Sequence, residues 1–272
     1  MQRRCAVVGH PVAHSLSPQI HRAAYARLGL DWDYQRVDIE PGGLPDFVAG
    51  LDASWRGLSV TMPHKEDAAR LGEPDAAVRL TGVANTIVIS PEGRTVHNTD
   101  VAGFVIALQA HGLDNVQRGC VVGNGATARS ALAALAQLGA TQVEVVGRNR
   151  DRIATVRPLA EKLGLKFRGH EFGADLTGVD LVISTVPAHG VALPEEVAEW
   201  APVVFDAIYD PWPTPLGTAA TAQGAMVLNG LDLLAGQAVD QVRWFTGEPV
   251  PFAAARYAAQ TGLDARSATG AT

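Results

Sequence analysis

The sequence predicts an α/β protein of two domains, and three observations favour this fold class. The chain has 272 residues, more than a single hydrophobic core usually organises. Short apolar runs alternate with helical patterns along most of the chain, which is typical of strands joined by crossover helices. The segment 120–138 begins as a buried strand, breaks at a glycine turn and continues as a helix rich in alanine and leucine.

Composition narrows the class of protein. The chain is 47% hydrophobic with a net charge of −6, and its Lys and Arg residues form no basic stripe, so we expect neither nucleic-acid nor membrane partners. The longest uncharged stretch, 211–231, is interrupted by prolines and polar residues and cannot be a membrane helix. Cys5 and Cys120 lie in predicted buried strands, which suits reduced thiols in the cytoplasm. No Cys/His spacing indicates a metal site.

The first hundred residues mix strands and helices. Ser17 is the expected N-cap of a helix whose first residue is Pro18. The strands 84–89 and 95–98 are expected to form a hairpin, and the polar tail 264–272 to be disordered. The remaining elements expected here are strands at 4–9, 34–39 and 57–60, and helices at 18–29, 43–51, just beyond residue 63, and at 75–80.

Polar clusters interrupt this pattern at strand ends. Each has an ordinary structural interpretation: a serine can cap a helix, a lone lysine is usually a solvated surface charge, and Asn, Asp and Thr often form turns. Their joint occurrence instead favours a ligand site, because ligands of α/β domains bind at the carboxyl ends of strands. Among the residues of these clusters, Lys65 and Asp100 are the only oppositely charged pair. Such a pair can transfer protons. The clusters contain Ser15 and Ser17, Thr61 and Lys65, Asn85 and Thr86, and Asn98 to Asp100.

The glycine turn of the second half indicates a dinucleotide site. Its pattern, G-x-G-x-x-A from Gly123 to Ala128, lets the backbone approach a pyrophosphate at a helix N-terminus. Proteins that prefer NAD usually place an acidic residue at the end of the next strand. Here Gly147 is followed by arginines at 148, 150 and 152. They are either an ordinary basic helix start or a site for the 2′-phosphate of NADP, and the second is favoured because cations are disfavoured at a helix N-terminus unless an anion offsets them.

Four short blocks together resemble the shikimate dehydrogenase family. They are G-H-P-V-A-H-S-L-S-P-Q-I-H at 9–21, V-T-M-P-H-K at 60–65, G-V-A-N-T at 82–86 and N-T-D at 98–100, and the resemblance continues through D-A-I-Y-D-P at 206–211. Val101 and Ala126 depart from the family pattern. The resemblance implies two α/β domains with a cleft between them: a substrate-binding domain from 1–100 and 235–272, and a Rossmann-type NADP-binding domain from 101–234.

The resemblance also implies the reaction and the roles of residues. The reaction is the NADPH-dependent, reversible reduction of 3-dehydroshikimate to shikimate, in chorismate and aromatic amino acid biosynthesis, by a monomer or homodimer without a metal. Lys65 and Asp100 are the expected catalytic residues. The expected substrate-binding residues are Ser15, Ser17, Thr61, Asn85, Asp100, Tyr209 and Gln237. The expected NADP(H)-binding residues are Gly123, Asn124, Gly125, Ala126, Thr127, Arg148, Asn149, Arg152, Thr185, Ala207 and Gly230.

Two other functions stay open at this point. One is a quinate/shikimate dehydrogenase that uses NAD, against which Ser17 and the arginines after residue 146 argue. The other is a non-catalytic paralogue that binds NADP as a sensor, against which the retention of Lys65 and Asp100 argues.

Overall fold

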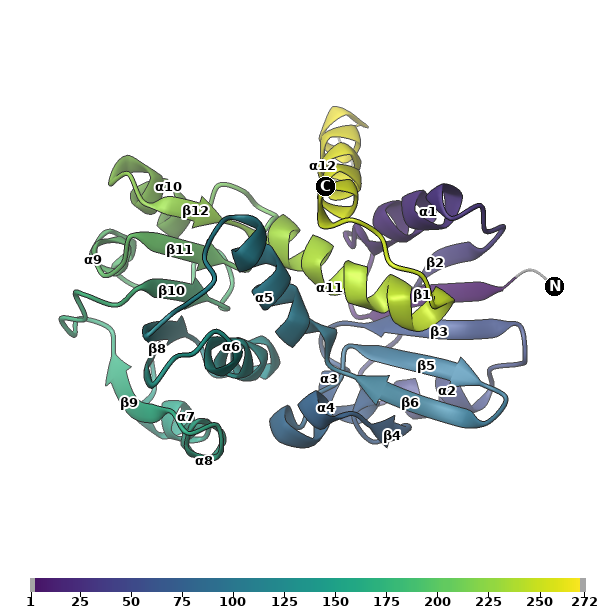
Figure 1. The fold of residues 1–272 in the computed structure, drawn as a ribbon, viewed down its shortest axis with the longest axis horizontal. Helices are drawn as coiled ribbons and strands as arrows, with labels where there is room; N and C mark the ends of the chain where they lie inside the picture. Colours follow the sequence, from purple (N-terminus) through teal and green to yellow (C-terminus); the bar gives the residue numbers. More distant parts are fainter. Residues whose placement is uncertain (1–2, 270–272) are drawn as a thin grey trace. The chain divides into compact units, whose positions relative to one another are not determined.

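Two sheets of six strands each organise the chain, which we describe from a computed structural model covering residues 3–269 (Figure 1). The chain forms two compact units. The first is Met1–Gly103 with Leu234–Thr272, and the second is Phe104–Leu233. The first boundary lies three residues beyond the predicted one, and the second lies one residue before it. Among the described residues, no helix is both long and apolar enough to cross a membrane.

The sheet of the first unit is mixed, and its strand directions decide which loops meet. Its order is β2-β1-β3-β5-β6-β4, with β1 parallel to β2 and β3, and β5 antiparallel to β3 and β6. The start of β5 and the end of β6 therefore lie at the same edge as the ends of β1 and β3. The strands are β1 (Arg4–Gly9), β2 (Asp33–Asp38), β3 (Trp55–Val60), β4 (Glu73–Pro74), β5 (Thr86–Ser90) and β6 (Gly93–His97).

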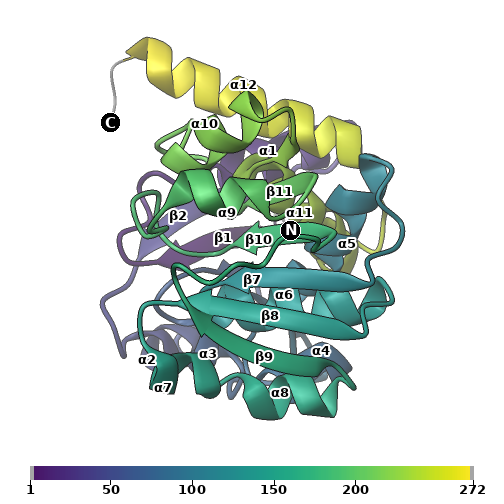
Figure 2. The same ribbon diagram turned by 90° about the vertical axis from the view of Figure 1, so that its left-hand side faces the viewer.

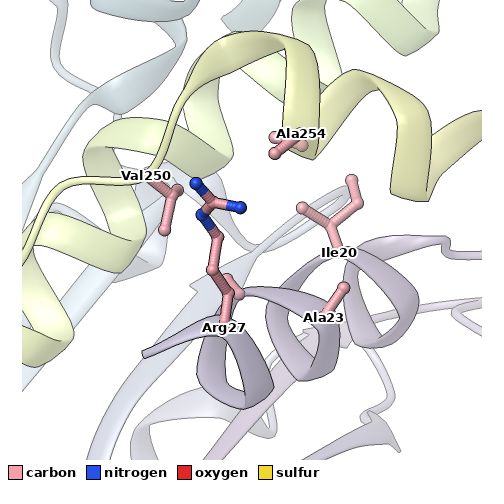
Figure 3. A pocket seen from close by; sticks show the side chains of 7 residues that line it. Ile20, Ala23, Arg27, Val250 and Ala254 are labelled. Carbon is pink, nitrogen blue, oxygen red and sulfur yellow. The ribbon is translucent and has the colours of Figure 1, made fainter. Parts of the chain in front are cut away.

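Helices from both ends of the chain complete the first unit. They are α1 (Ser17–Arg27), α2 (Leu44–Ala49), α3 (Lys65–Ala68), α4 (Ala76–Thr81) and α12 (Phe252–Thr269). Helix α12 packs on α1, leaving a small apolar cavity beside Ile20, Ala23 and Ala254 (Figure 3). The expected disorder of the tail is wrong for residues 264–269, which are helical, while 270–272 lie outside the described residues. Two helices, α5 (Thr99–Ala110) and α11 (Gly230–Thr246), belong partly to each unit.

The sheet of the second unit is wholly parallel. Its order is β12-β11-β10-β7-β8-β9, so the direction of strand succession reverses between β7 and β10, and Figure 2 shows β9, β8, β7 and β10 side by side. This is the doubly wound order of dinucleotide-binding domains, which confirms the predicted fold class. The strands are β7 (Arg118–Val122), β8 (Gln142–Gly147), β9 (Lys166–Glu171), β10 (Leu181–Ser184), β11 (Val203–Asp206) and β12 (Met226–Leu228).

The helices of this unit follow the strands. The segment between Arg150 and Gly164 forms two helices, with Thr155 and Val156 between them. Pro158 explains the break, because proline has no N–H to donate to the carbonyl of residue 154. The helices are α6 (Ala126–Gln137), α7 (Arg150–Ala154), α8 (Arg157–Lys162), α9 (Pro194–Glu199) and α10 (Pro215–Ala222).

Burial of apolar strand residues stabilises both sheets. Cys120, Val122, Val146, Val182 and Val204 belong to one fully buried cluster of the second unit, and burial of this kind contributes about 25 cal/mol per Å² of apolar surface. Cys5 and Cys120 are both buried, and both are free cysteines rather than partners in a disulfide. Burial raises the pKa of the Cys5 thiol to about 12 and also raises that of Cys120. Both thiols therefore stay protonated and act as small apolar side chains.

Candidate functional site

Lys65 and Asp100 form a mostly buried ion pair at the edge of the first sheet. Lys65 is the first residue of α3, just after β3, and Asp100 lies in the first turn of α5, just after β6. Lys65 Nζ is 2.5 Å from Asp100 Oδ2, and the two side chains are only 14% and 7% exposed. Lys65 is therefore not a solvated surface charge, and the interpretation of a lone lysine in those terms is wrong. A buried ammonium group beside a carboxylate can donate a proton to a ligand.

Asn85, which directly precedes β5, forms hydrogen bonds with Asp100 and with Thr99 at the start of α5. Its Nδ2 donates to Asp100 Oδ1 at 2.8 Å. Its Oδ1 accepts from the backbone N–H of Thr99 at 2.8 Å, and from the hydroxyls of Thr99 and Thr86 at 3.0 Å each. The side chain is buried and bonds across the sheet edge, so it cross-links the start of β5 with the start of α5 rather than closing a local turn.

Gln237 reaches the same cluster from the C-terminal part of the chain. It lies on α11, is 6% exposed, and its Oε1 is 3.4 Å from Asn85 Nδ2. Glycines let α5 and α11 touch at this level: a Cβ on Gly103 would lie 2.7 Å from the Gln237 nitrogen, and one on Gly236 would lie 2.3 Å from the Gly103 carbonyl oxygen. The sequence offered no signal for this backbone contact between residues that are far apart in the chain.

Ser15, Ser17 and Thr61 lie at the carboxyl ends of β1 and β3, where crossover connections of the sheet diverge. Such a divergence is where α/β sheets bind ligands. Both serines are buried. The prediction that Ser17 caps α1 is wrong: the N-cap is Leu16, and Ser17 is the first residue of the helix, its N–H donating to Ser15 Oγ at 3.3 Å. The backbone around Ser15 is held by Arg36, whose Nε donates to the Ser15 carbonyl oxygen at 2.8 Å.

Tyr209 is the one predicted substrate-binding residue that belongs to the second unit. It lies in the loop between β11 and α10 and is partly exposed. The base of that loop is closed by Thr214, whose hydroxyl donates to Asp206 Oδ2 at 2.6 Å and accepts from the Gly217 N–H at 2.9 Å. Burial raises the pKa of Asp206 above its usual value.

The glycine turn after β7 has the backbone that an anion site needs. Gly123 has φ of +117°, and a Cβ there would lie 2.5 Å from Thr185 Oγ1. Gly125 precedes α6 as its N-cap, so no side chain accepts from the N–H groups of the first helical turn, which includes Ala126 and Thr127. Helix N-termini of this kind bind phosphate groups through their N–H groups and dipole. The turn therefore has the exposed N–H groups and the backbone conformation that an anion site needs.

A cavity of about 720 Å³ extends from this turn to the end of β8. Arg148 and Arg152 line it together with Asn124 and Asn149. Arg148 precedes the N-cap of α7, which is Asn149, so it is not part of a basic helix start. Asn149 Oδ1 accepts from the Arg152 N–H at 2.9 Å, and Asn124 Nδ2 donates to the Arg152 carbonyl at 2.8 Å. The volume of this cavity and the positive charges of Arg148 and Arg152 suit a nucleotide that carries an additional phosphate.

Some lining residues were not expected from the sequence. Phe172 follows β9, and His189 and Gly190 follow β10, and all three line the same cavity. The sequence signal that could have identified them as lining residues is their position just after strands, because parallel sheets bind ligands at the carboxyl ends of their strands. The remaining predicted cofactor residues also follow strands: Thr185 comes after β10, Ala207 after β11, and Gly230 after β12. Ala207 and Gly230 lie close together, because a Cβ on Gly230 would be 2.6 Å from the Ala207 carbonyl oxygen.

Comparisons with known proteins agree on one family. A family model described as the shikimate dehydrogenase substrate binding domain matches residues 7–87. The shikimate dehydrogenase (NADP(+)) of Methylobacterium radiotolerans is 36% identical over 261 residues, covering 90% of this chain and 92% of its own. Crystallised shikimate dehydrogenase of Mycobacterium tuberculosis is 40% identical, with a TM-score of 0.88 and coverage of 95% of this chain and 99% of its own. The Thermus thermophilus enzyme, solved with NADP(H) and shikimate, is 30% identical with a TM-score of 0.85, covering 96% and 100%.

Proposed function

Because the chain belongs to the shikimate dehydrogenase family, we propose that it catalyses the reversible, NADPH-dependent reduction of 3-dehydroshikimate to shikimate. This is a step of chorismate and aromatic amino acid biosynthesis. The observation that carries the proposal is the ion pair of Lys65 and Asp100, 2.5 Å apart and nearly buried at the end of β3 and the start of α5.

Lys65 supplies the proton in this reaction. When bound, NADPH supplies the hydride to the ring carbonyl carbon. The Lys65 ammonium group donates a proton to the carbonyl oxygen as it becomes an alkoxide, and in the reverse direction the amine accepts the hydroxyl proton. General acid–base catalysis of this kind contributes about 10²- to 10⁴-fold. Asp100 holds the ammonium group in place and neutralises its charge, because an unpaired buried charge would cost several kcal/mol.

The other polar residues of the sheet edge bind the rest of the substrate. Ser15 and Ser17 are assigned to the carboxylate, which their hydroxyls can bind as donors. Thr61, Asn85, Tyr209 and Gln237 are assigned to the remaining polar groups of the substrate, with Asp100 as a further acceptor. Support comes from the burial of Ser15, Ser17, Asn85, Asp100 and Gln237, which lie on separate segments of the first unit.

The second unit is assigned the cofactor. Residues 123–127 would hold the pyrophosphate. Arg148, Asn149 and Arg152 would hold the 2′-phosphate, and Thr185, Ala207 and Gly230 would lie along the nicotinamide half. One charge-assisted hydrogen bond contributes about 1.5–3 kcal/mol, so a single arginine contact gives roughly ten- to a hundredfold preference for NADP over NAD.

The proposal extends to partners and compartment. We assign the chain to the cytoplasm, where its two free, buried cysteines remain reduced. Its partners are the small-molecule substrate and cofactor, without nucleic acid or membrane, and it acts as a monomer or homodimer. The net charge of −6 supports the exclusion of nucleic acid.

One assay tests the function. NADP reduction and NAD reduction are followed with shikimate and then with quinate as the substrate. We expect turnover of shikimate with NADP, with kcat/KM at least tenfold above that with NAD. Comparable turnover of quinate with NAD would identify a quinate/shikimate dehydrogenase instead. Binding of NADP without turnover of either substrate would identify a sensor and refute the enzymatic proposal.

A further inference from the structure

Gln241, one helical turn beyond Gln237 on α11, is fully buried, and protein groups fill all four of its side-chain hydrogen-bonding positions. Its Nε2 donates to the Asn85 carbonyl oxygen at 3.1 Å and to Thr86 Oγ1 at 2.9 Å. Its Oε1 accepts from Ser59 Oγ at 2.7 Å and from His21 Nε2 at 3.2 Å. A polar side chain satisfied in this way is held in one orientation.

The surroundings fix which end of the Gln241 amide faces the sheet edge. The Asn85 carbonyl oxygen can only accept, so the reversed amide would place two acceptors against each other. At the other end, Tyr34 OH donates to Ser59 Oγ at 2.6 Å, which leaves the Ser59 hydrogen to point at Gln241 Oε1. Both ends therefore require the same orientation.

Thr86 connects the orientation of the Gln241 amide with that of the Asn85 amide through two hydrogen bonds. Its oxygen accepts from Gln241 Nε2, and its hydrogen is donated to Asn85 Oδ1 at 3.0 Å. The Thr99 N–H donates to the same oxygen at 2.8 Å. Asn85 Oδ1 thus faces donors, and its Nδ2 faces Asp100 Oδ1 at 2.8 Å. An Asn85 amide turned the other way would put its oxygen against the carboxylate.

We infer that Gln241 and Thr86 are positioning residues that fix the amide orientation of Asn85 and thereby aim an N–H donor at the catalytic carboxylate of Asp100. The inference deepens the proposed function and rests on it for the role of Asp100. Neither residue needs to touch the substrate, because each acts through Asn85.

The groups behind Asn85 keep their hydrogen-bonding roles across the working pH range. Burial lowers the pKa of His21 to about 3, so its ring is neutral near pH 7. Burial raises the pKa values of Tyr25 and Tyr34, so both remain protonated. Within residues 3–269, the charged groups found facing Asn85 are Asp100, which it contacts, and Lys65, on the other oxygen of Asp100. If the Asn85 amide turned, Asp100 Oδ1 would lose this N–H donor and face the amide oxygen instead.

The test uses Thr86→Val, which removes the hydroxyl at nearly constant shape, with Thr86→Ser as the matched control that keeps it. Gln241→Met removes the amide at similar length. The side-chain NH₂ resonances of Asn85 are recorded by NMR in the ligand-free protein, and they are assigned through Asn85→Ala. We expect Thr86→Val and Gln241→Met to move these resonances, because the amide is then no longer held in one orientation. In both variants kcat/KM for shikimate should fall about tenfold, as expected for one lost hydrogen bond, and Thr86→Ser should change neither quantity.

The inference is overturned if the Asn85 NH₂ resonances of Thr86→Val coincide with those of Thr86→Ser while only its melting temperature falls, because Thr86 would then be merely structural. If Thr86→Val does not fold, the Asn85 NH₂ resonances of Gln241→Met decide in the same way. The NMR measurement needs no turnover, so its result is independent of the proposed function. Absence of shikimate oxidation by the unsubstituted protein would refute the function, whereas unchanged Asn85 NH₂ resonances would refute the positioning role.

Discussion

Lys65 and Asp100 lie 35 positions apart in the sequence, yet the Lys65 Nζ to Asp100 Oδ2 distance is 2.5 Å. The mixed sheet explains this. Because β3 and β6 run in the same direction, both antiparallel to β5 between them, their ends lie at one edge and place α3 next to the start of α5. The pair is therefore a consequence of topology, and its burial makes each partner dependent on the other.

This dependence predicts how the pair responds to substitution. Asp100→Asn leaves a buried ammonium group without its counter-charge, which typically costs about 3–5 kcal/mol of unfolding free energy. The double variant Lys65→Met/Asp100→Asn removes both charges and should recover most of that loss. Urea unfolding of the two single variants and the double variant measures the coupling. Strict additivity of the single losses would contradict an interaction between the buried charges.

The cofactor preference predicts the effect of removing Arg148. Arg148→Ala should raise KM for NADP at least tenfold and leave KM for NAD nearly unchanged, because only NADP carries the 2′-phosphate. Arg150→Ala is the matched control, since it removes the same charge from an exposed position two residues away. Initial rates at saturating shikimate measure both constants. An equal effect of the two substitutions would show that Arg148 acts only through the overall charge.

Burial of His21 predicts an acid-sensitive contribution to stability. Its pKa is about 3 in the folded chain, against an ordinary value of 6.5 when unfolded. The unfolded chain therefore binds a proton that the folded chain does not between these values. Stability should fall by about 1.4 kcal/mol per pH unit as pH decreases through this window. Above pH 6.5 the ring is neutral in both states and contributes no pH dependence.

Urea unfolding at several pH values tests this contribution against His21→Phe. The variant should be less stable at pH 8, because it loses the hydrogen bond to Gln241. Its unfolding free energy should then decline less steeply with acid, by about one proton's slope. Parallel declines in both proteins would mean that His21 becomes protonated within the folded structure.

The close approach of α5 and α11 predicts that Gly236 cannot carry a side chain. A Cβ there would lie 2.3 Å from the Gly103 carbonyl oxygen. Gly236→Ala should cost about 1–3 kcal/mol and raise KM for shikimate, because the adjacent Gln237 must move. Gly50→Ala is the control: its Cβ would meet neighbours only at 3.7 Å, with φ of −85°. Thermal unfolding and shikimate titrations compare the two, and equal effects would contradict a specific clash.

Much of this architecture could be predicted from local sequence. The strand, glycine turn and helix at 118–137 follow from apolar runs and glycine chemistry, as do the strands β5 and β6. What the sequence alone does not predict depends on contacts between distant segments. Gln241 is an unremarkable glutamine on an amphipathic helix until the fold places it behind Asn85. The cap prediction for Ser17 is wrong because α1 starts one residue earlier, a difference that local preferences rarely decide.

The cavity lined by Arg148 and Arg152 shows the same division. Gly123 and Arg148 line it as the sequence predicts, and the positive φ of Gly123 favours glycine. Phe172 lies at the same cavity only because β9 is the neighbour of β8 in the sheet. Strand order is a property of the whole sheet, so single-residue preferences do not contain it.

The role of Lys65 is tested most directly by Lys65→Ala, measured as kcat for shikimate oxidation together with the Kd of NADPH. The account predicts a fall in kcat of about 10²- to 10⁴-fold, because the proton donor and acceptor is lost. It predicts an NADPH affinity within about twofold of the unsubstituted protein, because the cofactor residues are assigned to the second unit. A large loss of NADPH binding, or a kcat that is unchanged, would contradict the assignment of Lys65 as the proton-transferring residue.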